Sequence, residues 1–351
     1  MKRVLLTGAG GAIGVHVLAH LLTNTDWEIV ALDSWRDEHK GYFDRITAVC
    51  EDHPDWPPRI KIFTHDLNAP FTDREIKDIG EIDYILNLAS RSDVQNSIDD
   101  PAPFIRNNTE LMLTMLDYAC RIWDLYDPLH EKPTGKIFLH FSTDEVYGSA
   151  AKDSKGHKEW SPILPSNPYS ASKAAQEALA IAWWRSYDLP LVITNTMNNF
   201  GEMQAPSKFP AMIQTKIQNG ETIKVHAAKN GEVGTRYYLH SRNAADAILF
   251  IIQQLGNPKL HQSGEIDMPD RYNIVGDKQV SNLDLVLTIS RLMGKDAKAE
   301  MAYFHDDNPG HDLHYGLDGS KLAALGWESP LTFEESLSRT IDWQKKHKEW
   351  M

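Results

Sequence analysis

Short apolar runs recur along the first part of the chain, and each one stops at a polar or glycine-rich stretch. Their length and β-branched content are those of buried parallel strands. They lie at 4–7, 28–32, 60–63, 84–89, 136–141 and 191–195. Longer apolar stretches, at 15–22, 104–122 and 169–187, have helical length. This alternation predicts an α/β fold built on a doubly wound parallel sheet.

The alternation becomes less regular after the sixth apolar run. Residues 197–201 and 206–210 are loop-like, and no internal repeat is visible. We therefore expect a first domain over residues 1–195, to which the chain returns around 235–255. Residues 196–351 are expected to form mainly a smaller C-terminal lobe.

A glycine-rich segment connects the first predicted strand to the first predicted helix. Gly8, Gly11 and Gly14 allow a tight turn, close approach to a pyrophosphate and close helix packing, which is the Rossmann-type dinucleotide pattern. Asp33 ends the second strand, nineteen residues after Gly14. A carboxylate there suits the ribose hydroxyls of NAD and repels a 2′-phosphate, while nearby Arg36 keeps NADP open as an alternative.

Two further strand ends contribute candidate cofactor contacts. The third strand leads to Asp66 and Leu67. Asp66 is either an acceptor for the adenine amino group or the N-cap of a following helix. The fourth strand leads to residues 90–94, which should pass beside the cofactor, because ligands bind at the carboxyl ends of such strands.

The fifth apolar run ends in the segment where we place the chemistry. Thr143 is followed by two adjacent acids, Asp144 and Glu145, at the carboxyl end of a strand. The alternative is a strand exit with solvated acids. Downstream, Tyr169 and Lys173 are four residues apart, so they share a helix face, where the ammonium favours the phenolate and makes Tyr169 a candidate base near neutral pH.

Composition excludes several classes of protein. The 36 basic and 49 acidic residues give a net charge of −13, which disfavours nonspecific binding to nucleic acid or to an anionic membrane. The longest apolar runs are too short to span a bilayer. Cys50 and Cys120 are too few for a disulfide framework or a cysteine metal site, and a reducing cytoplasm fits them.

A histidine- and aspartate-rich stretch near the C-terminus superficially suggests a metal site. Its spacing is loop-like and matches no recognised ligand pattern, so no metal is predicted. The residues are His305, Asp306, Asp307, His311, Asp312 and His314.

Together the glycine segment, Asp33, the acidic strand end and the Tyr169–Lys173 pair resemble the extended short-chain dehydrogenase/reductase family. Within it, the chain is similar to nucleotide-sugar 4,6-dehydratases of the dTDP-glucose 4,6-dehydratase type. Further similar segments lie at 198–201, 272–274, 309–312 and 326–343. The resemblance runs nearly end to end. It implies tightly bound NAD in the first domain and a nucleotide diphosphate sugar in the C-terminal, substrate-binding lobe.

The resemblance also implies a homodimer, formed through helices 104–122 and 169–187. Burial within one subunit explains the apolar helix at 104–122 equally well.

The resemblance assigns a role to each catalytic candidate. Tyr169 takes the proton of the sugar's C4 hydroxyl while hydride passes to NAD⁺, Lys173 lowers the pKa of the phenol, and Thr143 hydrogen-bonds nearby. Glu145 then removes the C5 proton, and protonated Asp144 donates to the departing C6 hydroxyl. Hydride returns to C6 and yields a 4-keto-6-deoxy sugar.

The resemblance also implies the binding residues. Those toward the cofactor are Gly8, Gly11, Ala12, Ile13, Gly14, Asp33, Asp66, Leu67, Leu88, Ala89, Asn108, Tyr169 and Lys173. Those toward the substrate are Ser92, Thr143, Asn198, Arg236, Asn273, His311 and Tyr315. Arg236 meets the diphosphate, with Asn198 and Asn273 as companions; a turn residue is the alternative for Asn273.

The adjacent acids discriminate among related enzymes. Small residues in place of Asp144 and Glu145 are expected of 4-epimerases, and the Glu without the Asp of decarboxylases, so a dehydratase is favoured. A catalytically silent NAD-binding scaffold needs none of the catalytic residues.

Several departures from the family pattern concern the substrate rather than the reaction. They are Ser90-Arg91-Ser92-Asp93 in place of Ala-Glu-Ser-His, Asn308 in place of an arginine, Leu313-His314 in place of an arginine-rich pair, and Tyr237-Tyr238 after Arg236. The sequence thus leaves the nucleotide and the hexose open.

Overall fold

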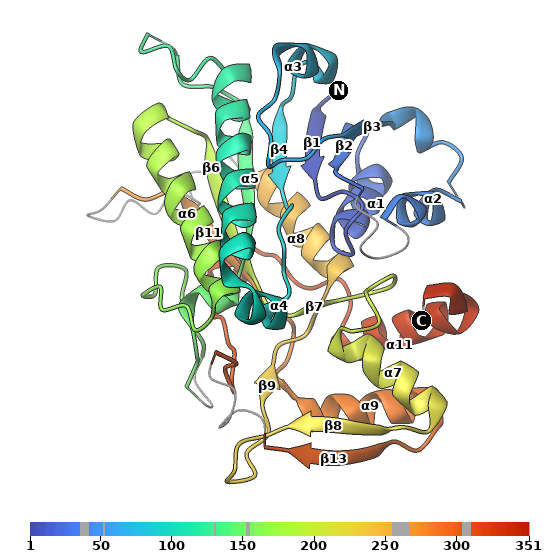
Figure 1. Ribbon diagram of the computed structural model, residues 1–351. Helices are drawn as coiled ribbons and strands as arrows, with labels where there is room; N and C mark the ends of the chain where they lie inside the picture. Colours follow the sequence, from blue (N-terminus) through green and yellow to red (C-terminus); the bar gives the residue numbers. More distant parts are fainter. Residues whose placement is uncertain are drawn as a thin grey trace.

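Seven parallel strands form the main sheet of the computed structural model, which describes residues 1–35, 42–51, 53–129, 131–151, 155–254, 267–303 and 310–350. The strand order is β11-β6-β5-β4-β1-β2-β3 (Figure 1). The strands are β1 (Arg3–Thr7), β2 (Glu28–Asp33), β3 (Ile60–Thr64), β4 (Tyr84–Asn87), β5 (Ile137–Thr143), β6 (Leu191–Thr196) and β11 (Asp270–Ile274). The predicted α/β class with a parallel Rossmann-type sheet is confirmed.

Most of the apolar runs form strands because helices cover both faces of the sheet. β3, at the edge of the sheet, is partly exposed instead. Side chains alternate between the two faces. On β1, Val4 and Leu6 pack against α1 (Gly14–Asn24) and α8 (Ser241–Gln254), whereas Leu5 packs on the opposite side. That opposite side is covered by α3 (Asp73–Ile79), α5 (Pro101–Ile122) and α6 (Pro168–Tyr187).

Helices α5 and α6 pack along each other within the subunit (Figure 1). Buried residues of α5, such as Met112, Met115 and Leu116, join the same core as Ala180 of α6. This contact accounts for the apolar character of α5.

The C-terminal half supplies both the seventh strand and a smaller α/β lobe. β11 pairs in parallel with β6, so residues beyond 196 enter the main sheet. The lobe has its own core, which includes Ile213, Val225, Leu285 and Leu337. It contains α7 (Phe209–Asn219), β8 (Thr222–His226), α9 (Asn282–Met293), β13 (Lys298–Ala302) and α11 (Phe333–Lys346).

Short elements join the two parts. β7 (Asn199–Phe200) pairs with β10 (Leu239–His240), and β9 (Thr235–Arg236) pairs with β12 (Val280–Ser281). The remaining helical segments are α2 (Tyr42–Cys50), η1 (Pro57–Arg59), α4 (Val94–Asp99), η2 (Asp144–Tyr147), α10 (Ser320–Ala324) and η3 (Lys348–Trp350). Across the described ranges, no helix has both the length and the apolarity needed to cross a bilayer.

Candidate active site

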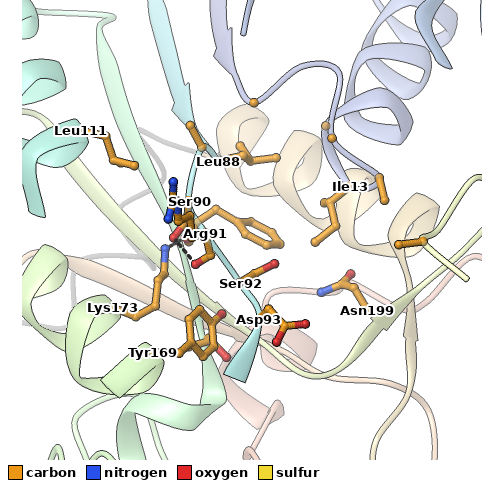
Figure 2. A pocket seen from close by; sticks show the side chains of 18 of the residues that line it. Ile13, Leu88, Ser90, Arg91, Ser92, Asp93, Leu111, Tyr169, Lys173 and Asn199 are labelled. Carbon is orange, nitrogen blue, oxygen red and sulfur yellow. Dashed lines mark hydrogen bonds between the residues drawn. The ribbon is translucent and has the colours of Figure 1, made fainter. Parts of the chain in front are cut away.

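A cavity of about 700 Å³ opens at the carboxyl ends of the main-sheet strands. Figure 2 shows Tyr169 and Lys173, from α6, across this space from Ile13 of the glycine loop. Most of the predicted site residues line it together: Gly8, Gly11, Ala12, Ile13, Gly14, Asp33, Asp66, Leu67, Leu88, Ala89, Ser92, Thr143, Asp144, Glu145, Tyr169, Lys173 and Asn198.

The glycine loop at one end of the cavity has no room for a side chain at Gly14 and little at Gly8. A Cβ on Gly14 would lie 2.0 Å from the Gly8 carbonyl oxygen, and Gly8 has φ of +68°. No side chain caps the start of α1, and its first turn carries no acid. Exposed backbone and an uncapped helix N-terminus suit a pyrophosphate, so the residues present fit a dinucleotide.

Asp33 stands beside this loop, where a ribose would bind. Its Oδ2 accepts a 3.0 Å hydrogen bond from the Gly10 amide and its Oδ1 a 3.1 Å bond from Trp35. Burial raises the pKa of the Asp33 carboxyl, and these amides oppose the shift. Arg36, on which the NADP alternative depended, lies outside the described residues.

Arg45 of α2 also lines this end and was missed by the sequence analysis. It is buried and donates from Nη1 to the Gly10 carbonyl at 2.9 Å and from Nε to the Met203 carbonyl at 3.1 Å. It thereby joins the glycine loop to the loop after β7. The charged residues around Arg45 are typical of a surface helix, so the sequence did not indicate a residue of the site.

Asp66 lies exposed in the cavity wall and does not begin a helix. Its Oδ1 accepts hydrogen bonds from the amide and side chain of Asn68. Helix α3 starts later, with Thr72 as N-cap and Glu75 closing a capping box. The N-cap interpretation of Asp66 is therefore wrong, and its place in the wall fits an adenine contact.

Tyr169 and Lys173 share one face of α6, as their spacing predicts. Lys173 Nζ donates to the Phe141 carbonyl at 2.8 Å. Burial lowers the pKa of Lys173 to about 7, and Glu177 opposes the shift. Burial raises the pKa of Tyr169, as do Glu145 and Asp144, against a hydrogen bond with Thr143. The expected lowering of the pKa of Tyr169 is thus not achieved by the protein's side chains alone, because the phenol is buried beside two acids.

Asp144 and Glu145 are buried, so the solvated-acid interpretation is wrong. Thr143 Oγ1 donates to Asp144 Oδ1 at 3.0 Å. Among the described residues, Asp144 Oδ2 has no hydrogen-bond partner. Burial and the neighbouring Glu145 raise the pKa of Asp144 to about 8. Burial also raises the pKa of Glu145, and Asn167 and Arg236 oppose that shift.

A buried polar network supports this strand end from behind. Asn195 Nδ2 donates to the Thr143 carbonyl at 3.0 Å and to Glu177 Oε1 at 2.8 Å. Glu177 Oε2 accepts from Arg271 Nη2, and Arg271 Nη1 donates to the Tyr147 hydroxyl. The sequence analysis assigned no role to these residues, because burial of distant polar side chains leaves no local pattern.

Arg236, His311 and Tyr315 lie outside the cavity wall. Arg236 donates to the carbonyls of Thr235, Asp312 and Leu313, and its guanidinium lies 4.0 Å from the centre of the Tyr315 ring. Its charge still favours the ionised forms of Asp144 and Glu145. Arg236 is therefore near the acids but bound to backbone.

Asn108 is not placed in the wall. It is buried on α5, where Nδ2 donates to the Arg91 carbonyl and to Ser172 Oγ, and Oδ1 accepts from the Arg91 amide. Its side-chain amide therefore holds the loop after β4 through the backbone of Arg91. The described contacts of Asn108 thus support a role in positioning this loop, and its direct contact with the cofactor stays a prediction.

Asn273 is also not placed in the wall. It is buried on β11, where Nδ2 donates to the carbonyls of His157 and Asp318. It borders a second cavity of about 580 Å³, together with Tyr237 and Trp327. Its Nδ2 thus bonds to His157 and Asp318, and the binding role beside Arg236 stays a prediction. The alternative of a turn residue is wrong, because Asn273 lies within a strand.

Lys208 and Asp93 are further wall residues without a predicted role. Lys208 precedes α7 and lies 3.3 Å from Asp93, the N-cap of α4, on the loop after β4. Lys208 therefore supplies a cation where the two parts of the molecule meet. Its only sequence signal is a basic residue in the loop-like stretch 206–210.

Within the described ranges, no three His, Cys, Asp or Glu side chains group as a metal site. His305, Asp306, Asp307 and Asn308 lie outside those ranges.

Comparison with known proteins agrees with this geometry. A model of the family described as GDP-mannose 4,6 dehydratase matches residues 5–340. The chain is 32% identical over 356 residues to a dTDP-glucose 4,6-dehydratase of Haemophilus influenzae, which covers 98% of each protein.

Solved structures share the fold. The crystal structure of dTDP-glucose 4,6-dehydratase from Bacillus anthracis in complex with NAD superposes with a TM-score of 0.79 at 25% identity, covering 100% of this chain and 98% of that one. A UDP-glucuronic acid 4-epimerase from Bacillus cereus gives a TM-score of 0.80 at 22% identity, covering 99% and 100%, and shows the fold alone. The chain belongs to the GDP-mannose 4,6-dehydratase family of NAD-dependent extended short-chain dehydrogenases/reductases, which act on nucleotide sugars.

Proposed function

We propose that the protein is a nucleotide-sugar 4,6-dehydratase, which converts a dTDP-glucose-like NDP-hexose into an NDP-4-keto-6-deoxyhexose. The observation that carries the proposal is the pair of buried adjacent acids, Asp144 and Glu145, in the same cavity as Tyr169 and Lys173. Burying two adjacent carboxyl groups costs folding free energy, because the charged form of each is disfavoured. A catalytic role would explain why the pair is present at this position.

The dinucleotide site would hold NAD through the glycine loop, Asp33 and the wall residues from Asp66 to Ala89. When bound, NAD would supply an acceptor for the C4 hydride and the hydride that is later returned to C6. NAD is preferred over NADP because the Asp33 carboxylate repels a 2′-phosphate.

The side chains divide the proton transfers among themselves. Tyr169 takes the proton of the C4 hydroxyl, with Thr143 as its hydrogen-bond partner and Lys173 one turn away on the same helix face, bonded to the Phe141 carbonyl. Glu145 removes the C5 proton, which the C4 ketone makes acidic. Asp144 is protonated at neutral pH, since its pKa is about 8, and donates to the C6 hydroxyl as it leaves as water.

The substrate's diphosphate would lie toward the smaller lobe. Asn198 and Lys208 line that side of the cavity, and Ser92 lies on the loop after β4. Residues 1–195, with the returning segment around 235–255, form the cofactor part, and residues 196–351 mainly the substrate part. We also propose a homodimer through exposed faces of α5 and α6, and a cytoplasmic location, which suits two free cysteines.

A nucleotide-sugar 4-epimerase is the second candidate, favoured by the matching fold of the Bacillus cereus epimerase. It uses the same oxidation by Tyr169 but needs neither acid. A decarboxylase would need Glu145 without Asp144, and a silent scaffold would need none of them.

The test is a substrate panel. Purified protein with NAD⁺ is incubated with dTDP-, UDP-, GDP- and CDP-hexoses, and the products are analysed by mass spectrometry and NMR. Loss of one water from a nucleotide sugar is the expected result, and it names the nucleotide. Inversion at C4 without loss of mass would support the epimerase, loss of carbon dioxide from a uronate the decarboxylase, and bound NAD with no turnover the scaffold.

A further inference from the structure

Asn167 begins helix α6, immediately before Pro168 and two residues before Tyr169. It is buried, and its Oδ1 accepts a 2.8 Å hydrogen bond from the Ser170 amide. Ser170 Oγ accepts in return from the backbone N–H of Asn167 at 3.1 Å, which completes a capping box. Capping alone would be served equally well by serine, threonine or aspartate, since each offers an oxygen acceptor.

The other end of the Asn167 side chain reaches the proposed base. Nδ2 donates to Glu145 Oε2 at 3.2 Å and to the Gly310 carbonyl at 2.9 Å. The orientation of the amide is fixed by its partners, because the Ser170 N–H can only donate and the Gly310 carbonyl can only accept. A nitrogen donor therefore faces Glu145.

The two adjacent acids consequently have different surroundings. Glu145 accepts from an amide donor that favours its carboxylate form. Asp144 accepts from Thr143 at Oδ1, and no described residue donates to its Oδ2. That oxygen is the free position for a proton, which an acid catalyst requires.

We propose that Asn167 is a positioning residue that makes Glu145 the base and leaves Asp144 as the acid in the elimination of water. The inference rests on the proposed dehydratase function. It adds the reason why Glu145 acts as the base and Asp144 as the acid. A cap residue is used here because it ties the base to the helix that carries Tyr169 and Lys173.

The same amide connects the base to the segment 310–315 of the C-terminal half. Gly310 receives the second hydrogen bond of Asn167, and Ser166 Oγ donates to Asp312 Oδ1 at 2.9 Å. Carbonyls of Asp312 and Leu313 hold Arg236. The position of Glu145 therefore depends on the docking of this segment.

Besides the amide of Asn167, several ionisable groups face Glu145. Their charges also influence the pH at which Glu145 titrates. They are Asp144 of η2, Tyr169 of α6, Lys208 before α7, Arg236 of β9, and Asp312 and Tyr315 of the segment 310–315.

The first readout needs no substrate. Protein labelled with ¹³C at the glutamate side-chain carboxyl is titrated by NMR, and the Glu145 signal is assigned with Glu145→Gln. Asn167→Ser keeps an oxygen acceptor for the cap and removes the Nδ2 group that donates to Glu145. The titration midpoint of Glu145 should therefore rise by about one pH unit. Asn167→Asp keeps the cap and adds a negative charge, so the midpoint should rise further.

The second readout separates the two chemical phases. NAD⁺ and dTDP-glucose, or the nucleotide sugar that the panel selects, are mixed rapidly with the protein while NADH absorbance is followed. In Asn167→Ser the appearance of NADH should keep its wild-type rate. Its decay, which requires removal of the C5 proton, should slow by about tenfold to a hundredfold, and its pH profile should shift upward with the NMR midpoint.

Thr332→Ala is the matched control, because Thr332 caps α11 by the same capping box but contacts neither acid. It should lower the melting temperature and leave both readouts unchanged. If Asn167→Ser only lowered the melting temperature, with the Glu145 midpoint and the decay of NADH at wild-type values, the inference would be overturned. If the midpoint moved but the wild-type protein formed no NADH with any nucleotide sugar, the influence of Asn167 on Glu145 would stand and the dehydratase function would fall.

Discussion

Glu177 and Arg271 form an ion pair in which Oε2 and Nη2 are 2.7 Å apart and neither side chain is exposed. Glu177 lies one turn beyond Lys173 on α6, and Arg271 lies on β11, which follows far later in the chain. The pair thus joins the seventh strand to the catalytic helix. Asn195 extends it to the Thr143 carbonyl.

Breaking this pair from either side should destabilise the fold. Glu177→Gln or Arg271→Met leaves one charge buried without its partner, which costs about 3–5 kcal/mol of unfolding free energy. The double variant should lose less than the sum of the two single losses, because no charge is left unpaired. Urea unfolding of the three variants measures this. Single losses below about 1 kcal/mol would show that water or other groups compensate for the missing partner.

Asp144→Asn should separate oxidation from elimination. The amide cannot donate an acidic proton to the C6 hydroxyl, so loss of water should slow by about 10²–10⁴-fold, whereas oxidation at C4 proceeds. NADH should then accumulate after rapid mixing with a substrate. A variant that turns over at the wild-type rate would remove Asp144 from the mechanism.

The same carboxyl predicts the pH dependence of elimination. Burial and Glu145 raise the pKa of Asp144 to about 8. The acid works in its protonated form, so elimination should fall as the pH rises through about 8, whereas protonation of the base Glu145 sets a separate fall at the acidic end. The wild-type decay of NADH, followed from about pH 6 to 10, checks this. An elimination rate that keeps rising above pH 9 would contradict the assignment of Asp144 as acid.

Tyr169→Phe should block the first step. Phenylalanine preserves the ring but has no hydroxyl, so the C4 proton has no acceptor and hydride transfer should fall by at least about 10²-fold. No NADH transient should appear, in contrast to Asp144→Asn. Binding of NAD, measured by calorimetry, should remain and serves as the control for folding.

Gly14→Ala should weaken cofactor binding by displacing the glycine loop. The added Cβ would lie 2.0 Å from the Gly8 carbonyl oxygen, so the glycine loop must move away from α1. Calorimetric titration with NAD should show at least a tenfold loss of affinity, about 1.4 kcal/mol or more. Gly220→Ala is a control, because no atom lies within 4 Å of its added Cβ, although its positive φ favours glycine. An unchanged affinity in Gly14→Ala would exclude this loop as the pyrophosphate site.

Much of the fold follows from local pattern. The six predicted strands correspond to β1 through β6. Five of them are apolar because both of their faces are covered, whereas β3 lies partly exposed at the edge of the sheet. The seventh strand, β11, was not predicted as one. Arg271 interrupts its apolar character, and partners distant in sequence, Glu177 and Tyr147, satisfy that arginine in the core.

The site divides in the same way. Local spacing was enough for the glycine loop, for Asp33 at a strand end and for Tyr169 with Lys173 on one helix face, since each depends on residues close in sequence. The protein partners of Asn108 and Asn273 could not be predicted, because the partners of an amide are set only when the chain around it is folded.

The sequence by itself determined the sheet, the dinucleotide loop and the residue types available for proton transfer, because strand patterning, glycine turns and helix periodicity are properties of neighbouring residues. The tertiary structure alone decided the ionisation of those residues. Burial, not Lys173, dominates the pKa of Tyr169. A hydrogen bond from Asn167 to Glu145 gives the two adjacent acids different surroundings. Both effects depend on depth in the protein and on contacts between distant segments, which local pattern does not encode.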